Sequence, residues 1–162
     1  MNIENLEKIL VEHPFLKDLP VDHIGTVVGC ASNRVFAAGE FLSREGEQAD
    51  QFFLLREGRV SLEVHSPNAG ALRIETLTDG DVLGWSWIIE PYRWHFDARA
   101  LTRVRAIALD GKCLRGKCDS DHELGWRLLR RFARVMEQRL QSTRLQLVDV
   151  YGRRKEPARE HA

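Results

Sequence analysis

The spacing of hydrophobic residues changes along the chain and divides it into helical and stranded parts. Apolar residues recur at helical spacing from Ile3 to Val11, with Pro14 ending the element, and again from Val21 to Ala31. From Val35 to Leu109 the period shortens to two, which is typical of half-buried strands. The pattern therefore predicts two short helices followed by a β-rich segment.

Glycines divide this β-rich segment into short strands. They stand at positions Gly39, Gly46, Gly58, Gly70 and Gly80. Turn residues at such regular intervals indicate an all-β sandwich or barrel. In the strand Arg59–His65, alternation predicts that Val60, Leu62 and Val64 point inward and that Ser61, Glu63 and His65 point outward. The segment Ser66–Gly70 has the composition of an exposed hairpin loop.

A long helix is predicted over residues 120–152. Ser120 and Glu123 have the spacing of a capping box, and Gly152 is the expected C-terminal breaker. At about 1.5 Å per residue the helix is roughly 45 Å long, which exceeds the width of a barrel of this size. We therefore expect two chains to pair through it as a homodimer, although packing across its own barrel alone is the alternative. The predicted dimerisation residues are Leu128, Leu129, Phe132, Val135, Met136, Leu140, Thr143 and Leu147.

Three segments follow from these patterns. Residues 1–119 are predicted to form the barrel domain with its N-terminal helices, residues 120–152 the dimerisation helix, and residues 153–162 a flexible, charged tail.

Charge and composition narrow the possible environments. The chain has 24 basic and 24 acidic residues, so it has no general attraction for nucleic acid or anionic lipid. No apolar run has membrane-spanning length, and the N-terminus lacks the features of an export signal. The three cysteines Cys30, Cys113 and Cys118 are sparse and odd in number, which favours a reducing compartment over a disulfide framework. We expect a cytoplasmic protein without membrane contact.

Sequence motifs for catalysis or metal binding are not found. The histidines include no His-x-His pair, and Cys113 and Cys118 lack the spacing of a zinc knuckle. No nucleophile elbow or phosphate-cradling glycine loop occurs. The carboxylates Glu45, Glu47 and Asp50 are assigned to a solvated turn. We expect no catalytic residue, no metal, no cofactor and no enzymatic activity.

Several motifs together resemble the cyclic-nucleotide-binding domain family. They are Gly39–Leu42, Glu45–Leu55, Gly58–Val60, Gly80–Gly84 and the helix ending Leu145–Gly152. The resemblance covers roughly residues 14 to 152 and implies a mainly β fold, a jelly-roll or double-stranded β-helix barrel flanked by helices. The last helix is similar to the dimerisation helix of bacterial catabolite-activator-type regulators. Those regulators append a helix-turn-helix after it, for which ten residues are too few, so no DNA binding is expected.

The motif that grips the nucleotide in this family departs from the family pattern. In the family a glycine-glutamate pair holds the ribose hydroxyl, and an arginine near the end of the same cassette pairs with the cyclic phosphate. Gly84 matches the glycine, but Trp85 replaces the glutamate and Trp94 replaces the arginine. An indole donates one hydrogen bond, accepts none and has no charge. Losing two such anchors is expected to weaken nucleotide binding by on the order of a hundredfold or more.

The replaced cassette, residues 84–97, permits two interpretations. Three of the four tryptophans lie in it, so it forms either a pocket for a nucleotide-like or aromatic molecule or a vestigial cavity filled by indoles. Trp87 is expected to be a core residue. The predicted ligand-binding residues are Gly84, Trp85, Ser86, Arg93, Trp94 and His95, with Gln138 and Arg139 of the long helix closing the pocket.

The sequence thus predicts a non-enzymatic, ligand-sensing regulatory module that acts on an effector protein. One alternative is a dimeric scaffold subunit with a tryptophan-filled pocket and no ligand. Another is cyclic-nucleotide binding with Arg93 as the phosphate anchor, which requires a loop or bulge at that position.

Overall fold

The computed structural model describes residues 3–153. Its helical elements are α1 (Ile3–Glu12), the 3-10 helix η1 (Pro14–Leu16), α2 (Val21–Val28), α3 (Gly111–Ser120) and α4 (His122–Arg153). Its strands are β1 (Ala31–Phe36), β2 (Phe41–Ser43), β3 (Gln51–Glu57), β4 (Val60–Ser66), β5 (Gly70–Leu77), β6 (Val82–Leu83), β7 (Asp97–Ala100) and β8 (Val104–Asp110). None of the helices in this range is long and apolar enough to cross a membrane.

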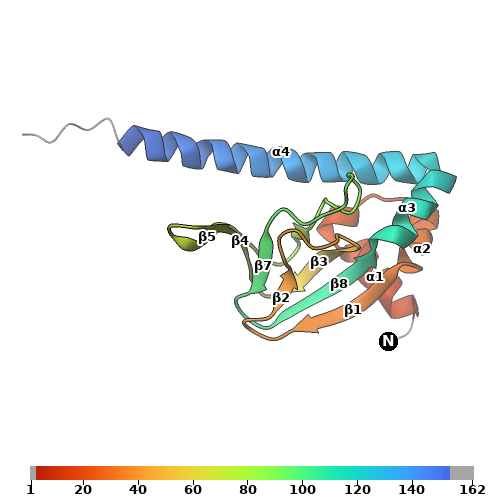
Figure 1. The fold of residues 1–162 in the computed structure, drawn as a ribbon. Coiled ribbons are helices and arrows are strands. Elements are labelled where there is room, and N and C mark those ends of the chain that lie inside the picture. Colours follow the sequence, from red (N-terminus) through yellow and green to blue (C-terminus); the bar gives the residue numbers. More distant parts are fainter. Residues whose placement is uncertain (1–2, 154–162) are drawn as a thin grey trace, which may run out of the picture.

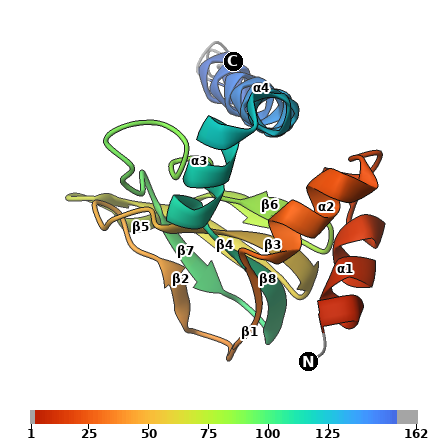
Figure 2. The same cartoon turned by 90° about the vertical axis from the view of Figure 1, so that its right-hand side faces the viewer.

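The strands form two antiparallel four-stranded sheets, with the orders β1-β8-β3-β6 and β2-β7-β4-β5. The N-terminal helices α1 and α2 lie beside the barrel, and α3 leads from it into α4 (Figure 2). Helix α4 runs along one side of the barrel and continues past the β4–β5 hairpin (Figure 1). The predicted mainly β barrel with flanking helices and a long last helix is therefore confirmed.

Two hydrophobic cores share strands β3 and β8. On β3, Phe52 belongs to a core between the first sheet and the helices, which we call the helix-side core. The next residue, Phe53, belongs to a core between the two sheets, which we call the inter-sheet core. Because successive side chains of a strand point to opposite faces, a strand buried on both faces needs a continuous apolar run. The sequence Phe52–Leu55 supplies that run, and all of it is buried.

The local predictions hold at most turns and fail at two places. All five predicted turn glycines have positive φ, which only glycine adopts without strain. Helix α2 ends at Val28 rather than Ala31, because Ala31 already pairs with Leu109 of β8. Ser61 and Glu63 are buried rather than exposed. Their polar groups are satisfied there, because Glu63 accepts hydrogen bonds from Ser61 (2.6 Å) and Arg99 (2.7 Å).

The start of α4 also differs from its prediction. Ser120 is the last residue of α3 and donates to the carbonyl of Gly116, so it caps nothing in α4. Asp121 is the cap instead, since its Oδ1 accepts from the backbone N–H of Leu124 at 3.1 Å. The helix continues through Gly152 to Arg153. Apart from Arg153, the predicted tail lies outside the described residues.

The predicted dimerisation residues occupy two faces of α4. Leu128 and Phe132 are buried in the helix-side core, so their assignment to a pairing surface was wrong. Val135 is half-buried against the same core. The rest of the set lies on a different face: Leu129, Leu140, Thr143 and Leu147 are exposed, and Met136 is half-buried.

Two of the three cysteines form a disulfide, although their number in the sequence favoured a reducing compartment over a disulfide framework. Cys30 and Cys113 are bonded, with Cα atoms 5.8 Å apart and a sequence separation of 83. They meet because β1 and β8 pair antiparallel, which places the residue before β1 beside the start of α3. Cys118 is free. The cysteines therefore give no support to the reducing compartment predicted from their number.

Candidate ligand site

The cassette between β6 and β7 is an irregular loop pinned to the turn before β3. The backbone N–H of Trp94 donates to the carbonyl of Glu47 at 3.0 Å, and the N–H of Gly46 donates to the carbonyl of Trp94 at 2.8 Å. The N–H of Ala49 donates to the carbonyl of Tyr92 at 2.6 Å. These three bonds fix which side chains of the cassette face inward.

Trp94 is the inward-facing residue near the C-terminal end of the cassette. Its indole is 6% exposed and belongs to the inter-sheet core. It lies directly on Gly84, where an added Cβ would be 2.5 Å from Cη2 of Trp94 and 2.8 Å from Cζ3. Gly84 has φ of +101°. Only a glycine there allows both the backbone turn and the close approach of the ring.

Arg93 points the other way. Its side chain is exposed and its Nη1 donates to the carbonyl of Gly46 at 2.9 Å. The residue pairs with Gln48 in an isolated bridge, so the one-residue step from Trp94 reverses the side chain as it does in a strand. The guanidinium thus lies at the surface rather than beside Gly84.

The other two cassette tryptophans pack on the helix side. Trp87 is fully buried, stacks on Phe52 with ring centroids 4.8 Å apart, and meets the edge of Phe132 of α4 at 5.4 Å. Its expected place in the core is confirmed. Trp85 is half-buried and stacks on His95 at 5.0 Å. Between them Ser86 is 1% exposed, and its hydroxyl has no hydrogen-bond partner among the described residues.

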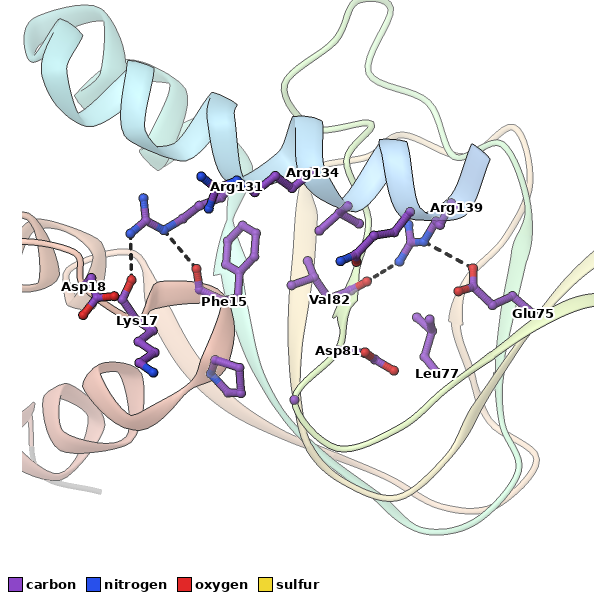
Figure 3. Close-up of a pocket in the computed structure, with 14 residues that line it drawn as sticks. Phe15, Lys17, Asp18, Glu75, Leu77, Asp81, Val82, Arg131, Arg134 and Arg139 are labelled. Atoms are coloured by element: carbon purple, nitrogen blue, oxygen red, sulfur yellow. Dashed lines mark hydrogen bonds and ion pairs between the residues drawn. The ribbon is translucent and has the colours of Figure 1, made fainter. Parts of the chain in front are cut away.

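Gln138 and Arg139 lie away from these rings, in a groove under α4. The groove holds about 400 Å³ and is bounded by η1, the β5–β6 region and α4 (Figure 3). Its lining comprises Pro14, Phe15, Lys17, Asp18, Glu75, Leu77, Gly80, Asp81, Val82, Arg131, Arg134, Val135, Gln138 and Arg139. A volume of this size suits a small molecule. The predicted site residues are therefore divided between the cassette and this groove.

Arg139 joins α4 to the second sheet at one end of the groove. Its Nε lies 3.3 Å from Oε2 of Glu75, and its Nη2 donates to the carbonyl of Val82. Burial lowers the pKa of Arg139, while the negative charges of Glu75 and Asp81 oppose that effect. Burial disfavours the charged form of Glu75 as well, which for a carboxyl group raises the pKa. This half-buried pair ties the middle of α4 to β5 and β6.

Sequence reasoning missed several residues that shape these sites. Phe52 and Phe132 complete the stack around Trp87, and Glu75 and Arg131 help to bound the groove. No spacing signal links Glu75 to Arg139, because they come from distant elements. A signal for the groove did exist in the spacing of Arg131, Arg134 and Gln138, which places these three polar residues on one face of α4.

The fold and the cassette define a class of domain: two packed antiparallel sheets with an irregular cassette between the sixth and seventh strands and a long helix beside them. The sequence profile described as "Cyclic nucleotide-binding domain" matches residues 33–121, which is more than half of the chain. The chain belongs to the cyclic nucleotide-binding domain family.

Relatives of the chain include a transcriptional regulator and a protein kinase. It is 28% identical over 115 residues to the "CRP-like cAMP-activated global transcriptional regulator" of Mycobacterium tuberculosis, covering 71% of this chain and 50% of that protein. It is 28% identical over 82 residues to human "cGMP-dependent protein kinase 2", covering 50% of this chain and 11% of the kinase. The chain thus spans half the length, or less, of these relatives.

Solved structures agree with the fold. A putative cyclic nucleotide-binding protein from Geobacter metallireducens superposes with a TM-score of 0.74 and 26% identity, covering 86% of this chain and 98% of that one. The sensor domain of the transcriptional regulator DNR from Pseudomonas aeruginosa gives a TM-score of 0.69 at 16% identity, covering 86% and 93% of the two chains. The second likeness is one of fold alone.

Proposed function

We propose that the chain is a non-enzymatic, ligand-sensing regulatory module that does not hold a cyclic nucleotide in the way usual for its family. The single observation behind this proposal is the position of Trp94, whose indole fills the inter-sheet core against Gly84. An uncharged ring there cannot pair with a phosphate. Trp85 stacks on His95 and offers no acceptor to a ribose hydroxyl.

Thermal melting with cyclic AMP and cyclic GMP tests this proposal. A ligand at a hundred times its dissociation constant adds about 2.7 kcal/mol, which for a domain of this size raises Tm by roughly 5 to 10 °C. We expect no such rise with either nucleotide. The Mycobacterium tuberculosis regulator, which is described as cAMP-activated, is the positive control. A saturable rise would favour the second candidate, in which Arg93 swings inward to anchor the phosphate.

A scaffold subunit without any ligand is the remaining candidate. The burial of Trp94 favours it, because its ring already occupies the interior beside Gly84 that a ligand of the cassette would need. The groove under α4 favours a sensor instead, since it offers space lined by Gln138 outside the filled cassette. Binding of any small molecule in that groove would decide between the two.

The module is proposed to work as a homodimer through the outer face of α4, with an effector protein responding to the position of that helix. Leu129, Met136, Leu140, Thr143 and Leu147 follow steps of seven, four, three and four residues, which is a coiled-coil seam. Within this seam Leu140 is 59% exposed and Leu147 is 51% exposed. Pairing would bury these apolar side chains.

We expect Leu147→Asp to convert the dimer to a monomer, because a charge in the seam would have to be desolvated on pairing. Leu145→Asp is the matched control: this leucine is more exposed, at 70%, but lies off the seam. Light scattering after size-exclusion chromatography measures the molar mass of both variants. A dimer that survives Leu147→Asp, or one that both variants disrupt equally, would place the interface elsewhere.

A further inference from the structure

The groove under α4 contains more positive charge than its own side chains neutralise. Four basic and three acidic side chains line it. Arg139 is paired with Glu75, and the carboxylate of Asp81 already accepts from the backbone N–H of Thr78 at 2.8 Å. The other three basic side chains, those of Lys17, Arg131 and Arg134, share one remaining carboxylate, Asp18, where α4 passes η1 (Figure 3).

Arg131 is held in place there without a carboxylate partner. Its guanidinium donates to three backbone carbonyls, those of Phe15 (3.0 Å), Lys17 (2.8 Å) and Arg127 (3.1 Å). Carbonyl oxygens orient a guanidinium but do not neutralise its charge. Burial lowers the pKa of Arg131, and the positive charges of Arg127 and Arg134 lower it further, while the negative charge of Asp18 opposes that effect. An anion bound beside this group would relieve that repulsion.

Arg134 and Gln138 stand one helical turn apart on the groove side of α4. Within residues 3–153 neither side chain makes a hydrogen bond or an ion pair, although both line the cavity. A guanidinium fork matches the two oxygens of a carboxylate or phosphate, and an amide adds a further donor. Beside these donors Phe15 and Val135 provide apolar surface.

We propose that this groove binds a small organic anion, whose carboxylate or phosphate is held by Arg131 and Arg134 and whose apolar body lies against Phe15 and Val135. This inference deepens the proposed function, on which it rests, by naming a site and a ligand class apart from the cassette. The groove has one wall on α4 and the others on η1 and the β5–β6 region. A molecule bound between them has different contacts if α4 shifts, which is the condition for a ligand to control the helix.

Calorimetric titration of the full chain at low ionic strength tests the site. The probes are phenyl phosphate and phenylacetate, with benzyl alcohol as the uncharged control. We expect saturable binding of one molecule per chain for at least one anion, and none for the alcohol. The anion that binds more tightly identifies the preferred head group. Absence of saturable binding by either anion overturns the site.

Two variants locate the binding. Arg134→Gln removes a charged donor and is expected to weaken binding about tenfold or more. Arg130→Gln is the matched control, because its guanidinium lies 5.7 Å from the ring centroid of Trp126 and Arg130 is not among the residues lining the groove; its affinity should stay within about twofold of wild type. If both variants lost affinity equally, the anion would be attracted by the overall positive charge of the helix, and the proposed site would be wrong. Failure of the anion site in either experiment leaves two other proposals intact. Thermal melting tests the lack of nucleotide binding, and light scattering tests the dimer.

Discussion

Trp87→Ala is expected to lower the free energy of unfolding by about 3 to 5 kcal/mol, the range for removing a buried tryptophan or phenylalanine. Trp87 is fully buried, and its ring contacts Phe52 of the first sheet and Phe132 of α4. Removing the indole opens a cavity where cassette, barrel and long helix meet. Urea unfolding, followed by circular dichroism, measures the loss.

Trp126→Ala is the control for this variant. Trp126 lies on α4 and is 59% exposed, so its removal should change stability by no more than about 0.5 kcal/mol. If Trp87→Ala costs less than about 1 kcal/mol, the cassette is not part of the core as described.

Loss of the Cys30–Cys113 disulfide should have an effect of similar size. The bond closes a loop with a sequence separation of 83 residues. In the chain-entropy treatment a loop of that length stabilises the folded state by about 4.5 kcal/mol, and measured losses run from about 2 to 5 kcal/mol. We expect the double variant Cys30→Ala/Cys113→Ala to show this loss in urea, and the oxidised wild type to show it when a reductant is added.

Cys118→Ala is the matched control, since Cys118 is unpaired. Burial raises the pKa of its thiol, and the carboxylates of Asp119 and Asp121 raise it further, so it should react slowly in the folded protein. Alkylation of the unfolded, unreduced chain should label Cys118 alone, and labelling after reduction should reach all three cysteines. Three labels without reduction, or unfolding curves that reductant does not move, would contradict the bond.

The sequence pattern was sufficient for the parts of the fold that depend on neighbouring residues. Positive φ at the turn glycines follows from their lack of a Cβ, and the burial of Phe52–Leu55 follows from a strand covered on both faces. The length of α4 follows from its unbroken helical spacing. The cap of α4 was misplaced by one residue because Ser120 and Asp121 are both good capping residues.

Contacts between distant segments were not readable from the sequence. Cys30 and Cys113 meet only through the pairing of β1 with β8, and Glu75 meets Arg139 only because α4 crosses the barrel. The family resemblance placed Trp85 and Trp94 at the positions of the nucleotide anchors, but it did not predict that the two rings enter different cores. In the fold Trp94 enters the inter-sheet core while Trp85 packs toward the helices. The same limitation assigned Gln138 to the cassette rather than to the groove under α4.

A crystal structure of the chain grown with an excess of cyclic AMP tests the central claim most directly. The expected electron density has the indole of Trp94 against Gly84, with no nucleotide between the sheets. Density for a cyclic phosphate beside Gly84, with Trp94 displaced and a guanidinium turned inward, would contradict it.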